Sequence, residues 1–277
     1  MKTTNSFFAI GALMLLMLCA PLLHAQEEAE NELKYLVITK KHWDLNKKDF
    51  KLSEWKALEK EYLEKVTKRN EYILLASVYL HNMTADNTEL LVVEGYSSWE
   101  NIDKSAKRSA ELAKEVWPDG EIRKAHFKNM DSYYSHEHSD EIYAPLNSTF
   151  KYLAEAPTKD MVVYVKRSHF AYPENGSYKE FDALNMEGLK GITFKNEYVK
   201  GYFSYVHAWG ADNTEYLEAY FLDSLADIDK MFDRDDALFK ETFPDNEENK
   251  AKIETWLTYF TGVHGDYIYT YIHDLSK

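Results

Sequence analysis

The sequence predicts an α+β protein made of two tandem copies of one β-α-β-β-α-α-β unit. Residues 53–143 align without a gap on residues 179–269, and 35 of the 91 pairs are identical, which is far beyond chance. Both copies also show the same succession of apolar runs and helical periodicities. Copy one therefore spans 33–146 and copy two spans 160–275, with a short linker at 147–159.

Local patterns justify each element of the first copy. Alternating or continuous apolar runs indicate strands, helical spacing indicates helices, and Ser or Asp at a boundary indicates a cap. We first expect a strand at 35–43 and a helix capped by Ser53. Strands at 72–83 and 90–96 follow, joined by an Ala-Asp-Asn-Thr turn. After them we expect a helix from Ser98 to Trp117, a third helix that starts at Pro118-Asp119 and runs to about residue 135, and a last strand at 142–146.

The second copy repeats this order. Its clearest elements are strands at 162–170 and 267–273, and Ser224 stands where Ser98 stands in the first copy, so we expect it to cap the matching helix. One residue is gained or lost in the loop after the first strand.

This element order is the split βαβ, or ferredoxin-like, pattern with one added helix. Each four-stranded sheet would carry helices on one face and leave the other bare, and the two sheets can cover each other by packing face to face. The chain thus resembles the dimeric α/β-barrel superfamily, which includes antibiotic-biosynthesis monooxygenase-like proteins, here fused as a pseudo-dimer over residues 33–275. The resemblance implies a cavity between or above the sheets. Its members include cofactor-free oxygenases, haem enzymes and proteins without chemistry, so it assigns no catalytic residue.

The first 25 residues have the pattern of a signal peptide. Lys2 gives the positive start, residues 7–18 form an apolar run, and Pro21 breaks it. We expect cleavage before Gln26 and a periplasmic or secreted bacterial protein, with no transmembrane segment after signal removal.

The single cysteine, Cys19, lies within this signal, so the mature chain would have no disulfide, thiolate metal site or cysteine nucleophile. Cleavage before Cys19 to give a lipoprotein is the alternative, and the bulky Leu18 disfavours it. The net charge of −14 opposes binding to nucleic acid or to an anionic membrane surface. Since each sheet already has its partner in the same chain, we expect a monomer.

Three histidines occur at matched positions in both copies. Histidine can serve as a base, a metal ligand or a haem ligand, and it can equally be a half-buried hydrogen-bonding residue at a strand end. The sequence leaves these alternatives open. The pairs are His42 with His169, His81 with His207, and His138 with His264.

The first strand of each copy ends in a cation and a histidine on one face. By strand alternation, Lys40 and His42 share the side of Leu36 and Ile38, and Arg167 and His169 share the matching side in copy two. An anionic or enolate-like group of a ligand would suit this pair. A solvated strand end explains it as well.

The hairpin of each copy carries a second polar group. Tyr and His lie two residues apart on one strand face, and a Glu begins the returning strand. Such a group could work as a proton relay or could pin the hairpin by hydrogen bonds. Its members are Tyr79, His81 and Glu89 in copy one and Tyr205, His207 and Glu215 in copy two.

The remaining matched motif is His138-x-Asp140 and His264-x-Asp266, which we expect in the segment between the third helix and the last strand. His136 adds a His-x-His in copy one, but Gly262 stands there in copy two, so no metal site is predicted. The glycine-rich nucleotide motifs and the H-E-x-x-H and G-x-S-x-G motifs are absent.

These observations favour a protein that binds a small, partly apolar ligand, with the matched His, Tyr, Glu, Lys and Arg residues as polar contacts. One alternative is an oxygenase-like enzyme on the same fold, cofactor-free or with haem. Another is a non-catalytic interaction module of the cell envelope. We expect the matched residues to form two related polar clusters, at least one of which opens into a cavity.

Overall fold

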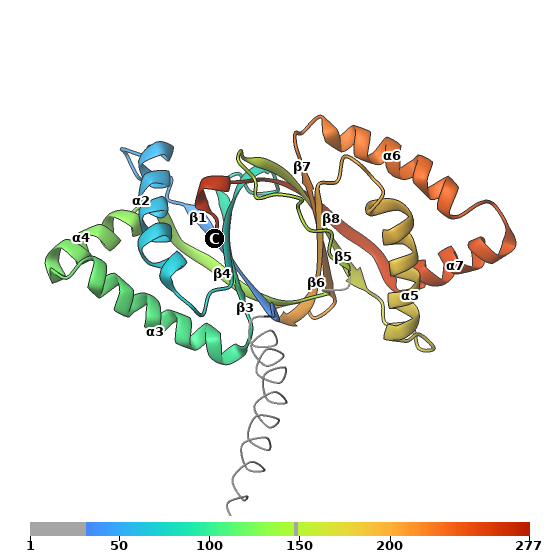
Figure 1. Cartoon of the computed structure of the whole chain (residues 1–277), viewed down its shortest axis with the longest axis horizontal. Helices are drawn as coiled ribbons and strands as arrows, with labels where there is room; N and C mark the ends of the chain where they lie inside the picture. The colour runs from blue at the N-terminus through green and yellow to red at the C-terminus, as the bar shows by residue number, and fades with distance from the viewer. Residues whose placement is uncertain (1–31, 147–148) are drawn as a thin grey trace, which may run out of the picture.

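A computed structural model describes residues 32–146 and 149–277 of the chain. The predicted signal peptide, residues 1–25, and its cleavage point lie outside the described residues. Within the described part, repeat 1 (33–146) and repeat 2 (160–275) each contribute four strands and three helices of eleven residues or more to one molecule (Figure 1).

The eight strands close into a barrel. Around it they follow the order β1-β3-β2-β8-β5-β7-β6-β4, and every pair of neighbours is antiparallel. Repeat 1 supplies β1 (Tyr35–Trp43), β2 (Leu75–Met83), β3 (Glu89–Tyr96) and β4 (Tyr134–Pro145); repeat 2 supplies β5 (Met161–Phe170), β6 (Gly201–Trp209), β7 (Glu215–Leu222) and β8 (Phe260–Tyr271).

The pseudo-dimeric α/β barrel predicted from the sequence is confirmed, but the contact between the two sheets differs from the expected one. The sheets do not stack face to face. They join edge to edge, through β2 with β8 and β4 with β6, so the bare faces become the inner wall of one barrel. Closure pairs the facing parts of all four edge strands, whose backbone groups stacked sheets would leave unpaired.

The helices cover the outside of the barrel. Figure 1 shows those of repeat 1 on one side of the strand ring and those of repeat 2 on the opposite side. Repeat 1 has α2 (Leu52–Lys65), α3 (Trp99–Val116) and α4 (Gly120–Asp131), with a short 3₁₀ turn at Thr67–Arg69; repeat 2 has α5 (Tyr178–Gly188), α6 (Asp227–Thr242) and α7 (Glu247–Thr258), with a π turn at Leu189–Thr193; a 3₁₀ turn at His273–Leu275 follows β8.

The predicted helix caps are right at two positions and wrong at two. The Ser98 side chain accepts a hydrogen bond from the Asn101 amide at the start of α3, and Asp119 caps α4. Ser53 lies inside the first turn of α2, because that helix already begins at Leu52. Ser224 is also no cap: α6 begins two residues later than the matching position, and the Ser224 hydroxyl donates to the Asp227 carboxylate.

The last strand of each repeat is longer than expected. The predicted third helix ends at Asp131, and β4 begins at Tyr134, so His138 lies on a strand and not in a loop. His264 lies on β8 in the same way. The early part of each strand pairs on one side only, β4 with β1 and β8 with β5, and most of its residues are exposed and form no apolar run, so the sequence gives no signal for it.

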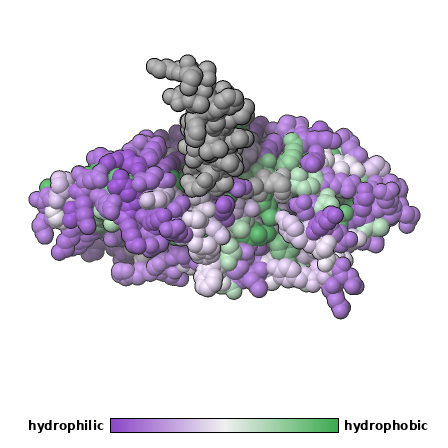
Figure 2. Space-filling model, turned by 60° about the horizontal axis from the view of Figure 1, so that its bottom comes forward, coloured by the Kyte–Doolittle hydropathy of each residue, from purple (hydrophilic) through white to green (hydrophobic). Residues whose placement is uncertain are grey.

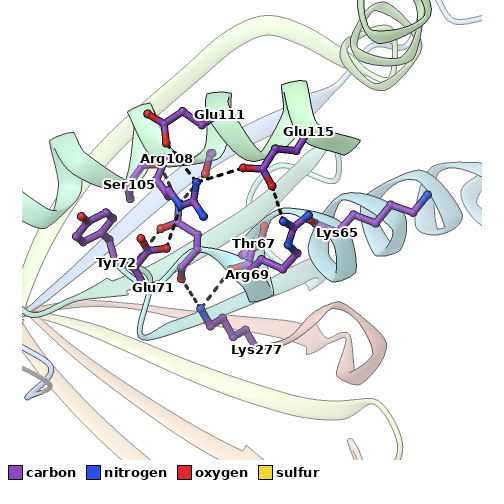
Figure 3. A network of polar contacts seen from close by, with 12 residues as sticks. Lys65, Thr67, Arg69, Glu71, Tyr72, Ser105, Arg108, Glu111, Glu115 and Lys277 are labelled. Carbon is purple, nitrogen blue, oxygen red and sulfur yellow. Dashed lines mark hydrogen bonds and ion pairs between the residues drawn. The ribbon is translucent and has the colours of Figure 1, made fainter. Parts of the chain in front are cut away.

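The end of the chain closes part of one barrel end. The Lys277 amide donates to the Ala76 carbonyl, and its Nζ donates to the carbonyls of Thr67 and Asn70. Burial lowers the pKa of the Lys277 ammonium. Figure 3 shows how this contact adjoins a surface network in which Arg108 of α3 binds Glu71.

The surface is polar over both helical lobes. In Figure 2 the apolar residues gather near the middle of the visible face, between the two lobes. None of the described helices combines the length and apolar character needed to span a bilayer.

Candidate ligand site in the barrel

The inner wall of the barrel follows from strand alternation. Along β1 the residues Leu36, Ile38 and Lys40 face inward, and Leu91 and Val93 do so on the neighbouring β3. They line a cavity of about 270 Å³. Its walls are mainly apolar and aromatic, with rings from Tyr79, Phe203, Tyr205, Phe221 and Tyr271.

The polar groups of the two repeats meet at one end of this cavity. Going round from β1 through β3, β2 and β8 to β5 crosses four antiparallel pairings, so β1 and β5 are parallel. Both strands therefore end at the same barrel end, which we call the polar end. Lys40 and Arg167 line the cavity there, whereas Lys277 and the start of β2 lie at the other end.

The first polar cluster joins Lys40, Glu89 and Tyr269. The Lys40 Nζ lies 3.0 Å from Glu89 Oε2, and the Tyr269 hydroxyl donates to Glu89 Oε1 at 2.6 Å. The Glu89 side chain is only 4% exposed, so both of its oxygens need these partners. Lys40 and Glu89 come from repeat 1 and Tyr269 from repeat 2, so the cluster exists only in the closed barrel.

The second polar cluster consists of Arg167, Glu215 and Tyr143, which match the three residues of the first cluster, and of one further residue. Arg167 Nη1 lies 3.1 Å from Glu215 Oε1, and the Tyr143 hydroxyl contacts Glu215 Oε2 at 2.6 Å. The addition is Glu141, whose Oε2 lies 2.5 Å from the same Tyr143 hydroxyl. A hydroxyl has one proton, so Tyr143 satisfies one carboxylate at a time, and the other keeps a free acceptor.

Electrostatics keep both tyrosines as donors. Burial raises the pKa of Tyr143 and of Tyr269, and the carboxylates beside them raise it further. For Arg167, burial alone would lower the pKa, but the facing oxygens of Tyr143 and Glu215 raise it above its ordinary value. Arg167 is therefore a permanent cation at the cavity wall, and its Nε is buried without a hydrogen-bond partner among the described residues.

The histidines lie around this site and hold the hairpin turns. His42 Nδ1 lies 3.1 Å from both Thr88 Oγ1 and Asp86 Oδ2, and His169 makes the same two contacts in repeat 2. His81 Nδ1 lies 2.8 Å from Thr84 Oγ1. His207 Nε2 is buried and has no partner among the described residues.

The last pair of histidines is exposed. His138 lies 3.7 Å from Asp140 and His264 lies 3.4 Å from Asp266, on the outer parts of β4 and β8. Neither residue lines the barrel cavity.

The structure therefore brings some of the predicted residues together and separates others. Lys40, Tyr79, Arg167 and Tyr205 line the cavity, and Glu89 and Glu215 anchor its polar end. Of the two alternatives for the Glu-His-Tyr group of repeat 1, the relay is not formed, because Glu89 binds Lys40 and Tyr269, and Tyr79 accepts a hydrogen bond from Ser77.

Sequence reasoning missed four residues of the site: Tyr143, Tyr269, Glu141 and Tyr267. The signal was present, since the matched His-x-Asp-x-Ile-Tyr motif ends in Tyr143 and Tyr269. Each tyrosine contacts a glutamate of the other repeat, across the seam where β4 pairs with β6 or β2 pairs with β8. These contacts exist only in the closed barrel, so the sequence of one repeat does not reveal them.

The site residues do not fit a metal or a histidine-ligated haem. No group of three or more His, Cys, Asp or Glu residues in the described ranges is placed to hold a metal ion. Among the described residues, no histidine lines the barrel cavity or the cavities that α3 and α6 cover, and His207 alone borders a pocket beside β5 and α5.

Comparison with known proteins supports the fold. No protein-family model matches the sequence, and no curated protein matches it. A solved structure of a candidate monooxygenase from Lactobacillus acidophilus is 11% identical, with a TM-score of 0.53 over 88% of this chain and 96% of that one. An anthrone oxidase-like protein is 12% identical, with a TM-score of 0.51 over 90% of this chain and 94% of that one.

A mutant chlorite dismutase from Candidatus Nitrospira defluvii is also similar, at 11% identity and a TM-score of 0.51 over 88% of this chain and 94% of that one. At such identities the likeness shows a shared fold, the dimeric α/β barrel of ferredoxin-like units.

Proposed function

We propose that this pseudo-dimeric α/β barrel binds a small, mostly apolar molecule that carries a carboxylic acid or enol group, with the polar group at the polar end. One observation carries the proposal most strongly. Arg167 lines a mainly apolar cavity, yet its buried Nε has no hydrogen-bond partner in the part of the chain that the structure describes. An unpaired buried donor costs on the order of 1–3 kcal/mol, which a ligand oxygen would recover.

The cavity wall suits the body of such a ligand. Apolar side chains and tyrosine rings surround a space of about 270 Å³, near the lower limit of small-molecule pockets. Moving an apolar ligand into this space removes its surface from water, which is the main source of affinity in such sites.

The polar end suits a group that both accepts and donates. Arg167 and Lys40 have N–H groups beyond those used by Glu215 and Glu89, and these can donate to a ligand oxygen. Of the two carboxylates at Tyr143, one keeps a free acceptor, which can receive the ligand proton. A carboxylic acid has an acceptor oxygen and a donor hydroxyl on one carbon, and an enol hydroxyl both donates and accepts.

The test is a calorimetric titration with 3-phenylpropionate. We expect saturable binding to the wild type and a loss of roughly tenfold in R167Q, because a charge-assisted hydrogen bond is removed. K166Q is the matched control, since it removes the same charge from the next residue, which faces outward toward Glu218. Equal affinity of R167Q and wild type would contradict the proposal, as would equal binding of the neutral 3-phenylpropan-1-ol.

A cofactor-free oxygenase is the second candidate. It is favoured by the carboxylates at Tyr143 beside the Arg167 cation, since such a base could take a proton from a substrate whose anion Arg167 then stabilises. A structural neighbour is an anthrone oxidase-like protein. Anthrone and O₂ should then give anthraquinone and water faster with wild type than with R167Q, measured by oxygen uptake. Uptake at the uncatalysed rate would exclude this reaction.

Export and a monomeric state complete the proposal. The N-terminal pattern of residues 1–25 supports export, and the closed barrel, which contains both repeats, supports a monomer. N-terminal sequencing should find Gln26, and light scattering should give the mass of one chain.

A further inference from the structure

We propose that repeat 2 holds a second, separate binding site, on the outside of the barrel, for a planar aromatic molecule with a hydroxyl group. The site is a pocket of about 350 Å³ beside the end of β5 and the start of α5. Phe170, Phe181 and Tyr259 form its wall, and His207 lies at its edge.

The pocket stands where repeat 1 is filled by rings. Trp43, Phe50 and Trp55 pack there, with the Trp43 ring centre 4.9 Å from Trp55 and 5.2 Å from Phe50. The repeat alignment matches these positions with Phe170, Gly176 and Phe181. The residues after Phe50 and Gly176, Lys51 and Ser177, both precede the first helix of their repeat, which confirms this match.

At these three positions repeat 2 has two smaller rings and no ring in place of Phe50. Pro173 and Tyr259 lie beside Gly176, and Tyr216 adds a ring where repeat 1 has Leu90, so these side chains form the walls of the pocket or support them. Phe170 and Phe181 keep the edge-to-face contact that Trp43 and Trp55 make, with ring centres 5.2 Å apart and ring planes at 88°. The arrangement of the two rings is therefore conserved between the repeats, while the rings themselves are smaller. The remaining walls are tilted aromatic rings, with Phe181 and Tyr259 at 5.6 Å. Such walls favour another ring, because aromatic groups prefer edge-to-face and offset contacts.

Two exposed tyrosines border the pocket. Tyr172 and Tyr178 line it and are each 64% exposed. Tyr172 has φ of 49°, and among the described residues it is the one non-glycine with positive φ. Its hydroxyl donates to the Asn213 carbonyl, which holds its ring beside the pocket in this unfavourable backbone conformation.

His207 supplies the reason for a hydroxyl on the ligand. In repeat 1 the matched His81 has Thr84 Oγ1 at 2.8 Å, but Gly210 replaces that threonine in repeat 2. In repeat 2 it is the other ring nitrogen, the His207 Nε2, that lies next to Gly210, 3.4 Å from where a Cβ would be, and it is buried without a partner among the described residues. A phenolic hydroxyl can donate or accept, so it can pair with the imidazole in either tautomer.

The experiment uses 4-bromophenol, with 4-bromotoluene as the probe that lacks the hydroxyl. We expect saturable binding of 4-bromophenol in solution, weaker binding of 4-bromotoluene by roughly tenfold, and a bromine anomalous peak in the pocket in crystals. F181W, which restores the ring found at Trp55, should abolish this binding. K40Q changes the barrel site through Glu89, which does not line this pocket, and should leave the binding of 4-bromophenol unchanged.

Y178A is the second variant, since this exposed side chain is dispensable for folding and its loss should weaken binding about fivefold. The proposal is overturned if the bromine peak lies only inside the barrel, if no binding occurs, or if F181W or Y178A folds and binds as well as wild type. Failure of 3-phenylpropionate to bind would not affect this result, because the two sites have different walls.

Discussion

The two repeats share a frame and differ in the side chains that meet at the polar end of the barrel. In both, a histidine, a threonine and an aspartate hold the hairpin turn, as His42, Thr88 and Asp86 do in repeat 1. In both, a glutamate receives a tyrosine from the other repeat. The residues that hold the hairpin turns and the contacts between the two repeats are thus the same in both copies.

Some of the many differences change the volume or the charge at the two sites. Lys40 corresponds to Arg167 and Glu141 to Tyr267, and the packed tryptophans Trp43 and Trp55 correspond to phenylalanines. Repeat 2 therefore gained a fixed guanidinium and a pocket, whereas repeat 1 has filled aromatic packing. The comparison teaches that matched residues in a duplicated protein mark the frame, and that the unmatched neighbours distinguish the sites.

The largest expected effect contrasts aromatic packing in the two repeats. Trp55 is 1% exposed, packs on Trp43 and donates to the Tyr134 hydroxyl. We expect W55A to lower the free energy of unfolding by about 3–5 kcal/mol. F181A removes a smaller ring beside an existing pocket and should cost clearly less. Urea denaturation of both variants measures the difference, and equal losses would mean that repeat 2 is packed as tightly as repeat 1.

A second prediction concerns positions where the repeats should behave alike. Asn70 and Asn196 are fully buried, and each donates from Nδ2 to a helix carbonyl and accepts a backbone N–H two residues on. We expect N70A and N196A each to cost about 2–3 kcal/mol, because several buried partners lose their hydrogen bonds. Thermal or urea unfolding should give equal values within error; a large inequality would break the shared-frame account.

We expect the carboxylates of the two polar clusters to contribute unequally to the free energy of unfolding. E89L leaves Lys40 and the Tyr269 hydroxyl without their carboxylate, at a cost of about 2 kcal/mol. E215L should cost roughly 1 kcal/mol less, since Tyr143 can still donate to Glu141. In the E141L/E215L double variant this advantage should vanish, so the two changes should be non-additive. Additive losses in a double-mutant cycle would show that Glu141 gives no support.

The smallest effect is a pH dependence at one matched position, where repeat 1 has a carboxyl group and repeat 2 has none. Burial raises the pKa of Glu94, against the opposing bond from the Tyr96 hydroxyl, whereas Tyr220 stands at the matched position. The folded protein therefore holds this proton more tightly than the unfolded chain does. Its contribution to stability is present below the unfolded pKa, about 4.3, and is lost as pH rises through the raised folded pKa.

The E94Q variant has no carboxyl group to deprotonate at this position, so it should not lose this stability. Its free energy of unfolding minus that of the wild type should therefore increase as pH rises from about 4 toward 7. Y220F is the control and should show the wild-type pH dependence. A constant difference between E94Q and wild type across this range would contradict the assignment.

The sequence predicted the frame well because the frame rests on local signals. The β1 bounds match, Ser98 and Asp119 act as caps, and β1 lies beside β3 as expected from the ferredoxin-like order. The inward face of Leu36, Ile38 and Lys40 also follows from alternation alone.

What the sequence could not give depends on closure of the barrel. Pairing of β4 with β6 brings Tyr143 to Glu215, and pairing of β2 with β8 brings Tyr269 to Glu89. No periodicity within one repeat encodes a contact with the other. The matching of the histidines suggested a functional role, but His42 and His169 bind aspartates of the hairpin turns.

The most direct test of the ligand site is a crystal structure of the protein with 3-phenylpropionate. The account predicts the phenyl ring inside the barrel near Tyr79 and Phe221, and the carboxylate within about 3 Å of Arg167 at the polar end. A ligand bound only between the helices and the barrel wall, with the interior of the barrel holding none, would contradict it.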